Sequence, residues 1–263
     1  MRIYFQKDDE VVLYQGDAVE ILKKLPESFV DLIITSPPYN VGKLYGKDVN
    51  DTKSYEEYLK FAKSWLEGAY QVLKYGGRIA VNVPSCIQQS TRSKYAYMAY
   101  DYVRLMREVG FIDMDWIVWV KTVNGLPVAK DTAWGSWCSP SHPYVRDACE
   151  YIIVMAKGSR KRVDRKGKND ITSEEFMQFT TNVWMISPTR DREHPAVFPK
   201  ELPYRLIKLY TWKEDVVLDP FSGSGTTLIV GVELGRKMIG IEIEERFCEL
   251  IVKRLKMVSR RLL

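Results

Sequence analysis

The segment Asp31-Leu32-Ile33-Ile34-Thr35-Ser36-Pro37-Pro38-Tyr39-Asn40 joins an apolar run to a pair of prolines. The apolar run is typical of a buried strand, which cannot continue through two residues that fix φ and lack an N–H. The pattern therefore predicts a strand over residues 31–35 that ends in a rigid turn. Open α/β sheets bind ligands at the carboxyl ends of such strands. An ordinary strand exit has the same pattern, so the rest of the chain has to distinguish the two.

Alternating strand and helix patterns surround this segment and predict an α/β fold. Strands are expected at residues 11–14, 31–35, 78–83, 111–121, 150–156, 215–219 and 238–242. Helices are expected at residues 18–25, 97–109, 199–210, 226–234 and 244–261, with a further helix opened by the capping box of Ser54 and Glu57 and ended by the glycines at 76 and 77. The strands at 111–121 and 150–156 can pair antiparallel across the insertion between them.

A second motif lies near the far end of the chain, where a hydrophobic strand at 215–219 enters the turn Gly223-Ser224-Gly225 and a helix. Such a turn directs backbone N–H groups at a ligand. Glu242 ends the next strand, where a carboxylate accepts hydrogen bonds from ribose hydroxyls. The third glycine of the dinucleotide fingerprint is absent, because position 228 is Leu. The spacing predicts a nucleoside cofactor and favours S-adenosylmethionine over NAD.

The composition is that of a globular protein of 263 residues, 46% hydrophobic and 28% charged. The four cysteines are scattered and the chain has only two histidines, so the sequence does not favour a zinc site and no metal is expected. The sequence contains no signal-peptide pattern and no apolar run long enough for a bilayer. We therefore expect a cytoplasmic protein with no membrane partner. The net charge of +5 is modest but unevenly distributed.

Residues 122–148 and 157–193 do not fit the pattern of a regular core. Asn124 and Gly125 form a loop signal, and aromatic residues follow it. Residues 157–168 carry seven basic side chains against one acid, Asp164. A basic run is usually a solvated face, but beside a site that acts on a polyanion it contacts phosphates. The candidate contacts are Asn124, Arg160, Lys161, Arg162, Arg165, Lys166 and Lys168.

Together the two motifs resemble those of the amino-methyltransferases of DNA. The resemblance implies a catalytic motif made of Ser36, Pro37, Pro38 and Tyr39. It implies a binding site for S-adenosyl-L-methionine made of Asp17, Thr35, His194, Phe198, Asp219, Pro220, Phe221, Ser222, Gly223, Ser224, Gly225, Thr226, Thr227 and Glu242. His194 and Phe198 belong to a segment similar to the one that flanks the methionine part of the cofactor. Asp17, at a strand end, is equally well explained as a helix N-cap.

The motif order, catalytic motif first and cofactor turn last, resembles that of the circularly permuted group called beta. The implied fold is a Rossmann-like methyltransferase sheet, mostly parallel with one antiparallel hairpin strand, and with inserted DNA-recognition segments. Residues 1–121 would form the catalytic half, 122–193 the recognition insertions around a core strand near 150–156, and 194–263 the cofactor half. The strand ending at Thr35 would lie next to the strand ending at Asp219.

The activity implied by this resemblance is transfer of a methyl group to the exocyclic N4 of cytosine in duplex DNA, by base flipping and direct in-line attack. Ser36 and the Pro37 carbonyl would accept the amine hydrogens, and Tyr39 would stack on the base. Serine at the first motif position favours cytosine in this family, and N6 of adenine is the alternative. Double-stranded DNA is the implied partner in a prokaryotic nucleoid. A cognate restriction endonuclease is compatible with the family, as are a monomer and a homodimer.

Two more distant interpretations remain. A DNA-binding module without enzymatic activity would need only the basic segment, and retention of both motifs argues against it. Methyltransferases of protein or RNA also use an x-P-P-Y turn, but their glycine turn precedes it in the chain.

Overall fold

The computed structural model describes residues 1–42, 53–88, 95–129, 134–162, 167–189, 193, 197 and 199–259, and one large mixed sheet organises them. The strands follow the spatial order β1 (Arg2–Lys7), β2 (Val11–Gln15), β12 (Lys237–Glu242), β11 (Val216–Asp219), β3 (Val30–Thr35), β4 (Leu73–Pro84), β9 (Cys149–Lys157), β7 (Phe111–Val123) and β10 (Val183–Ile186). A short strand, β8 (Leu126–Pro127), pairs with β7, while β5 (Ile87–Gln88) and β6 (Tyr95–Ala96) form a separate hairpin.

The strand directions agree with the predicted α/β sheet and extend it. β2, β12, β11, β3 and β4 are parallel neighbours, which confirms the predicted adjacency of the strands ending at Thr35 and Asp219. β9 runs antiparallel to both β4 and β7, as expected for the hairpin. Besides the two-residue strands β5, β6 and β8, two strands of the sheet were missed. β1 pairs antiparallel with β2, and β10, assigned to an insertion by the sequence, pairs parallel with β7 at the sheet edge.

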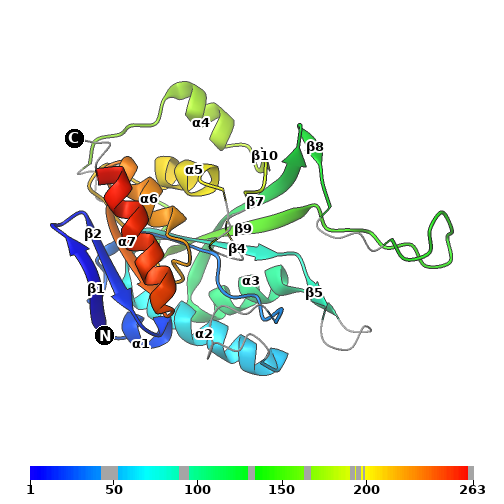
Figure 1. Cartoon of the computed structure of the whole chain (residues 1–263), viewed down its shortest axis with the longest axis horizontal. Coiled ribbons are helices and arrows are strands. Elements are labelled where there is room, and N and C mark those ends of the chain that lie inside the picture. The colour runs from blue at the N-terminus through cyan, green and yellow to red at the C-terminus, as the bar shows by residue number, and fades with distance from the viewer. Residues whose placement is uncertain are drawn as a thin grey trace.

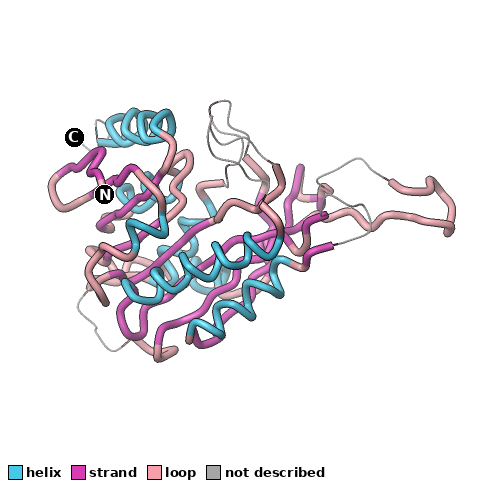
Figure 2. Tube along the Cα trace, turned by 90° about the horizontal axis from the view of Figure 1, so that it is seen from below, coloured by secondary structure: helices cyan, strands magenta, loops and turns pink. Residues whose placement is uncertain are grey.

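Helices cover both faces of the sheet (Figure 1). One face carries α1 (Ala18–Leu22), α2 (Tyr55–Val72) and α3 (Met98–Val109), whose apolar residues share one buried cluster. The other carries α5 (Glu201–Tyr210), α6 (Thr226–Glu233) and α7 (Glu245–Ser259), which share a second cluster. The short α4 (Ser173–Phe179) contacts α5. Seen from below, helices lie in front of the strands and run roughly along them (Figure 2).

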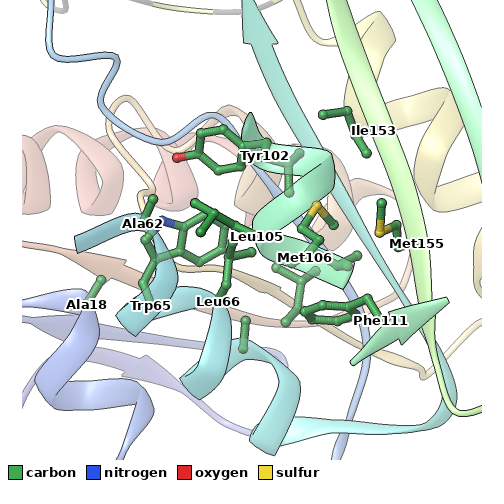
Figure 3. Packing of buried hydrophobic residues seen from close by; sticks show 14 of the residues in the cluster. Ala18, Ala62, Trp65, Leu66, Tyr102, Leu105, Met106, Phe111, Ile153 and Met155 are labelled. Carbon is green, nitrogen blue, oxygen red and sulfur yellow. The ribbon is translucent and has the colours of Figure 1, made fainter. Parts of the chain in front are cut away.

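The first layer packs through large side chains of α2 and α3. Trp65 and Tyr102 are fully buried, with ring centroids 6.2 Å apart. Leu66, Leu105 and Met106 fill the space around them (Figure 3). Burial of side chains of this size contributes roughly 1.5–3 kcal/mol each. This packing fixes α2 beside the turn that follows β3. The fully buried Tyr58 of α2 contacts that turn.

Local signals explain where α2 begins and ends. Ser54 and Glu57 form the predicted capping box, in which the Ser54 hydroxyl accepts the Glu57 N–H and the Glu57 carboxylate accepts the Ser54 N–H. The predicted end at Gly76-Gly77 is wrong, because α2 ends at Val72 and β4 begins at once. The two glycines lie inside β4, where a Cβ on Gly77 would come within 2.9 Å of the Leu73 side chain. The two glycines therefore allow the irregular register between β3 and β4 and do not end α2.

None of the described helices is both long and apolar enough to cross a membrane. Within the same residues, no group of three or more histidine, cysteine, aspartate or glutamate side chains is arranged to hold a metal ion.

Candidate active site

The two sequence motifs meet at one edge of the sheet, where the parallel strands β3 and β11 end side by side. The Thr35 hydroxyl donates a hydrogen bond of 2.9 Å to Asp219 Oδ1. Both side chains are buried, at 1% and 2% exposure. The turn that follows Thr35 and the turn that follows Asp219 are therefore held next to each other by a direct contact.

Three hydrogen bonds hold the proline turn after β3. The Tyr58 hydroxyl donates to the Pro38 carbonyl at 3.0 Å. Asn40, with a left-handed φ of 56°, binds Lys53 twice: its Nδ2 donates to the Lys53 carbonyl and its Oδ1 accepts the Lys53 N–H, each at 2.8 Å. No described donor reaches the Pro37 carbonyl, so this predicted acceptor has no competing partner in that part of the chain.

A polar network lies behind Ser36. The Ser36 and Tyr39 hydroxyl oxygens are 2.6 Å apart. The Asn82 side-chain amide donates to the Tyr39 oxygen at 3.0 Å and to Glu150 Oε2 at 2.7 Å, and Glu150 pairs with Lys121. Asn82, Glu150 and Lys121 fall in strands predicted from the sequence, and no functional role was predicted for them. Polar residues inside otherwise apolar strand patterns were the signal that could have found them.

The glycine turn after β11 requires glycine at two positions. Gly223 has a left-handed φ of 50°, and its N–H donates to a Glu242 carboxylate oxygen at 2.7 Å. Gly225 has a φ of 79°, and a Cβ there would lie 2.8 Å from the Ile251 side chain. Left-handed backbone and close approach together favour residues without a side chain.

The other predicted cofactor residues of this turn lie within it or at its end. The Phe221 N–H donates to Asp219 Oδ1 at 3.1 Å, the Ser222 hydroxyl to the Asp219 carbonyl at 3.0 Å, and the Ser224 and Thr226 hydroxyl oxygens are 3.1 Å apart. Pro220 and Thr227 are buried, and Thr227 is the second residue of α6.

Two buried carboxylates give this edge an acidic character. Burial raises the pKa of Asp219 to about 6 and that of Glu242 to about 7. Neither carboxylate forms an ion pair with a described lysine or arginine, although each accepts backbone N–H hydrogen bonds. Buried carboxylates without a cationic partner suit a ligand that brings positive charge and hydroxyl donors. S-adenosylmethionine, a sulfonium nucleoside with an ammonium group, has both features, so these residues fit the cofactor implied by the resemblance.

Asp17 is the N-cap of α1 and accepts the Glu20 N–H at 3.0 Å. The adjacent Gly16 N–H donates to the Glu242 carbonyl at 2.9 Å, which places Asp17 near the same edge. A cofactor contact for Asp17 stays a prediction. His194 and Phe198 lie outside the described residues, as do Arg165 and Lys166.

The surroundings of Arg162 differ from those of an exposed phosphate-binding side chain, and its DNA-binding role stays a prediction. Its guanidinium is 7% exposed and pairs with Asp31 and Asp215. Asp31 is the second residue of β3 and Asp215 immediately precedes β11, so Arg162 binds the segment after β9 to the sheet edge opposite Ser36. β3 has six residues, which corresponds to about 20 Å between the two edges. A run of basic residues in the sequence does not distinguish such a buried ion pair from a phosphate-binding face.

The other described residues of the basic run are at that opposite edge too. The Arg160 carbonyl accepts a hydrogen bond from Arg78, and the Lys168 carbonyl accepts the Lys213 N–H just before β11. The carbonyl of Lys161 would lie 2.7 Å from a Cβ on Gly76. The structure therefore does not bring Arg160, Lys161 and Lys168 together with Ser36.

The insertion after β7 leaves from the same edge as Ser36. Asn124, with a φ of 51°, and Gly125 form the turn between β7 and β8. The arm of residues 134–148 follows and projects away from the sheet (Figures 1 and 2). In this arm the Arg146 guanidinium lies 3.4 Å from the centre of the Trp134 ring, and Trp137 packs edge-on against Trp134 while remaining 68% exposed.

Comparison with known proteins agrees with this geometry. The family model described as DNA methylase, for N6 and N4 methylation, matches residues 30–253. The chain is 38% identical over 189 residues to the type II methyltransferase M.MjaVI of Methanocaldococcus jannaschii, covering 72% of this chain and 92% of the relative. It is 30% identical over 259 residues to the DNA adenine methyltransferase YhdJ of Escherichia coli, covering 94% of this chain and 83% of the relative.

A solved structure matches nearly the whole length of the chain. It is a protein of Thermus thermophilus, classed provisionally as a DNA modification methylase and crystallised with S-adenosyl-L-methionine. It superposes with a TM-score of 0.74 at 29% identity, covering 95% of each chain.

Proposed function

The chain belongs to the N6/N4 DNA methylase family, and on that premise we propose that it methylates the exocyclic N4 of cytosine in duplex DNA. It is a DNA methyltransferase that uses S-adenosylmethionine. The observation that carries the proposal is the hydrogen bond between Thr35 and Asp219, because it joins a turn rich in acceptors to a turn suited to the cofactor.

The preference for cytosine depends on Ser36. Serine at this position of the motif favours N4 of cytosine within the resembled family. N6 of adenine is the alternative, and the name of the Escherichia coli relative, a DNA adenine methyltransferase, favours it. Either target is an exocyclic amine whose lone pair is conjugated into a ring.

In the proposed mechanism the protein binds both amine hydrogens. Ser36 Oγ and the Pro37 carbonyl are the acceptors, and together they draw the nitrogen toward tetrahedral geometry, which frees its lone pair for attack. The ring of Tyr39, anchored through its hydroxyl, stacks on the base. Orientation and fixed dipoles would then supply most of the rate enhancement. No covalent bond to the protein is needed: the bond from nitrogen to methyl would form as the bond from methyl to sulfur breaks, which leaves a neutral thioether, and one amine hydrogen would leave as a proton to water.

Glu242 and the backbone of Gly223 and Gly225 are the proposed holders of the cofactor's nucleoside, with Thr35, Asp17, His194 and Phe198 as further proposed contacts. When bound, the cofactor supplies an electrophilic methyl group. Desolvation of the buried carboxylates Asp219 and Glu242 is relieved when donors or positive charge face them.

The arm of residues 134–148 and the turn at Asn124 are the proposed DNA contacts. The target base must leave the duplex, at a cost of a few kcal/mol. The arm and the turn lie beyond the carboxyl end of β7, at the same edge of the sheet as the half-buried Ser36. A companion restriction endonuclease is a proposal that follows from relatives named as type II methyltransferases.

The test is to incubate the purified protein with unmethylated DNA and S-adenosylmethionine, digest the DNA to nucleosides, and separate them by mass. N4-methylcytosine is the expected product. N6-methyladenine as the sole product would replace cytosine by adenine as the target. If no methylated nucleoside is formed while a Ser36→Ala control is equally inactive, the proposed activity is wrong.

A further inference from the structure

The Tyr39 hydroxyl is the junction between Ser36 and the buried polar network. Its oxygen lies 2.6 Å from Ser36 Oγ, 3.1 Å from the Asn82 backbone carbonyl and 3.3 Å from Glu150 Oε2. The Asn82 side-chain amide donates to it at 3.0 Å. Three acceptors thus surround a hydroxyl that has one proton to donate.

The orientation of the Asn82 amide follows from its partners. Its Nδ2 lies 2.7 Å from Glu150 Oε2. The reversed amide would place Oδ1 against a carboxylate oxygen at that distance, with no proton between them. With Nδ2 toward Glu150, Asn82 is a donor to both Glu150 and Tyr39.

The direction of the Tyr39 proton follows by the same reasoning. If Tyr39 donated to Ser36, its lone pairs would face the Asn82 carbonyl and the Glu150 carboxylate at 3.1 and 3.3 Å without a hydrogen bond. If it donates inward, its one proton lies toward these two acceptors and forms a hydrogen bond with one of them. The proton between Ser36 and Tyr39 must then come from Ser36.

Glu150 is held where this arrangement needs a carboxylate. Its side chain is 10% exposed and pairs with Lys121, itself 14% exposed. The Lys121 ammonium lies 5.1 Å from the centre of the Trp119 ring. The Lys121 ammonium and the Asn82 amide therefore both face the Glu150 carboxylate and hold it beside Tyr39.

We propose that Glu150 is a positioning residue that draws the Tyr39 proton inward, so that the Ser36 hydroxyl donates to Tyr39 and turns its lone pairs to the target amine. This inference rests on the proposed amine methylation. Ser36 in the opposite orientation would point its own proton away from Tyr39 and lose one acceptor site. The network therefore decides that Ser36 is the donor in its hydrogen bond to Tyr39, which leaves both Ser36 lone pairs available to accept from the amine.

The kinetic test is a double-mutant cycle on unmethylated DNA with Glu150→Gln, Tyr39→Phe and the double variant. Each single change should lower kcat about 10-fold or more, since hydrogen bonds to charged groups are of that strength. The double variant should be no slower than Tyr39→Phe alone, because Glu150 acts through the hydroxyl that this variant lacks. Glu108→Gln, an exposed change on α3, is the matched control and should retain full activity.

Cofactor affinity and the thermal midpoint of Glu150→Gln are measured alongside. The cycle overturns the inference if Glu150→Gln is fully active, if the two losses multiply, or if the loss follows weakened cofactor binding or unfolding. The wild-type protein in the same assay tests the proposed function separately, because absence of methyl transfer to DNA would refute that function alone.

Neutron diffraction from a deuterium-exchanged crystal tests the inference without any turnover. The Tyr39 deuteron should point toward Glu150 or the Asn82 carbonyl, and the Ser36 deuteron toward Tyr39. A Tyr39 deuteron that points at Ser36 would overturn the inference whatever the enzyme methylates.

Discussion

Thr35 and Asp219 are 184 residues apart in the chain and share a buried hydrogen bond of 2.9 Å. The bond links the ends of β3 and β11 and therefore the two halves of the active site. Asp219 has no described cationic partner, so the Thr35 hydroxyl is one of few groups that compensate its burial. The hydrogen bond therefore stabilises the fold and also fixes the two turns relative to each other.

Thr35→Val should lower the free energy of unfolding by about 1–3 kcal/mol, because it leaves a buried carboxylate with one donor fewer in an unchanged shape. Urea unfolding measures this change. Thr35→Ser keeps the hydroxyl and should lose less. Equal losses in the two variants would mean that the methyl group, not the hydrogen bond, is what the site needs.

Cofactor affinity should depend on pH through Glu242. Burial raises its pKa to about 7, from a usual value of about 4.3. In the free protein the carboxyl is therefore largely protonated at pH 6, whereas hydrogen-bond donors on the ligand favour the carboxylate. Binding of S-adenosylmethionine, measured by calorimetry, should strengthen about 10-fold from pH 6 to pH 8.

Glu242→Gln should remove most of that pH dependence and weaken binding at pH 8. A profile as steep in Glu242→Gln as in the wild type would assign the titration to another group. The sign for stability is opposite. Because the folded-state pKa is raised, the stabilising contribution of protonated Glu242 to the free protein is present below about pH 4 and lost as the pH rises through 7.

Arg162→Met should destabilise the protein by about 3 kcal/mol or more, since it leaves Asp31 and Asp215 buried without this partner. Lys161→Ala, an exposed neighbour, should change stability by less than about 0.5 kcal/mol. Urea unfolding measures both. At a salt concentration and temperature where Arg162→Met is folded, its DNA affinity should equal that of the wild type, and a selective loss of DNA affinity would support the original prediction.

The fold was predictable where the chain carries its own local signals. The apolar run before Ser36, the glycine turn after Asp219 and the capping box at Ser54 each depend on neighbours a few residues away. β1 and β10 were missed because their pairing partners, β2 and β7, are defined only once the sheet has formed. The hydrophobic alternation of a short edge strand is too brief to distinguish its sequence from that of a loop.

The candidate site divides in the same way. Ser36, Pro37, Tyr39 and the glycine turn carry recognisable spacing. Asn82 and Glu150 do not, because they act on Tyr39 from strands that the topology brings together from 43 and 111 residues away. The ion pairs of Arg162 were not predicted, because charge in a sequence does not reveal whether Asp31 and Asp215 lie within reach.

Trp137→Ala should weaken DNA binding while leaving the fold and cofactor affinity unchanged. The side chain lies in the arm and is 68% exposed, so its truncation creates no cavity, and an aromatic contact with a base or sugar contributes about 1–3 kcal/mol. Fluorescence anisotropy with labelled duplex DNA at fixed salt measures the change. Tyr100→Ala, which removes an equally exposed ring from α3, is the control and should retain wild-type DNA affinity. If both variants lose affinity alike, the loss is not specific to the arm, and if neither does, the arm is not the DNA-binding surface.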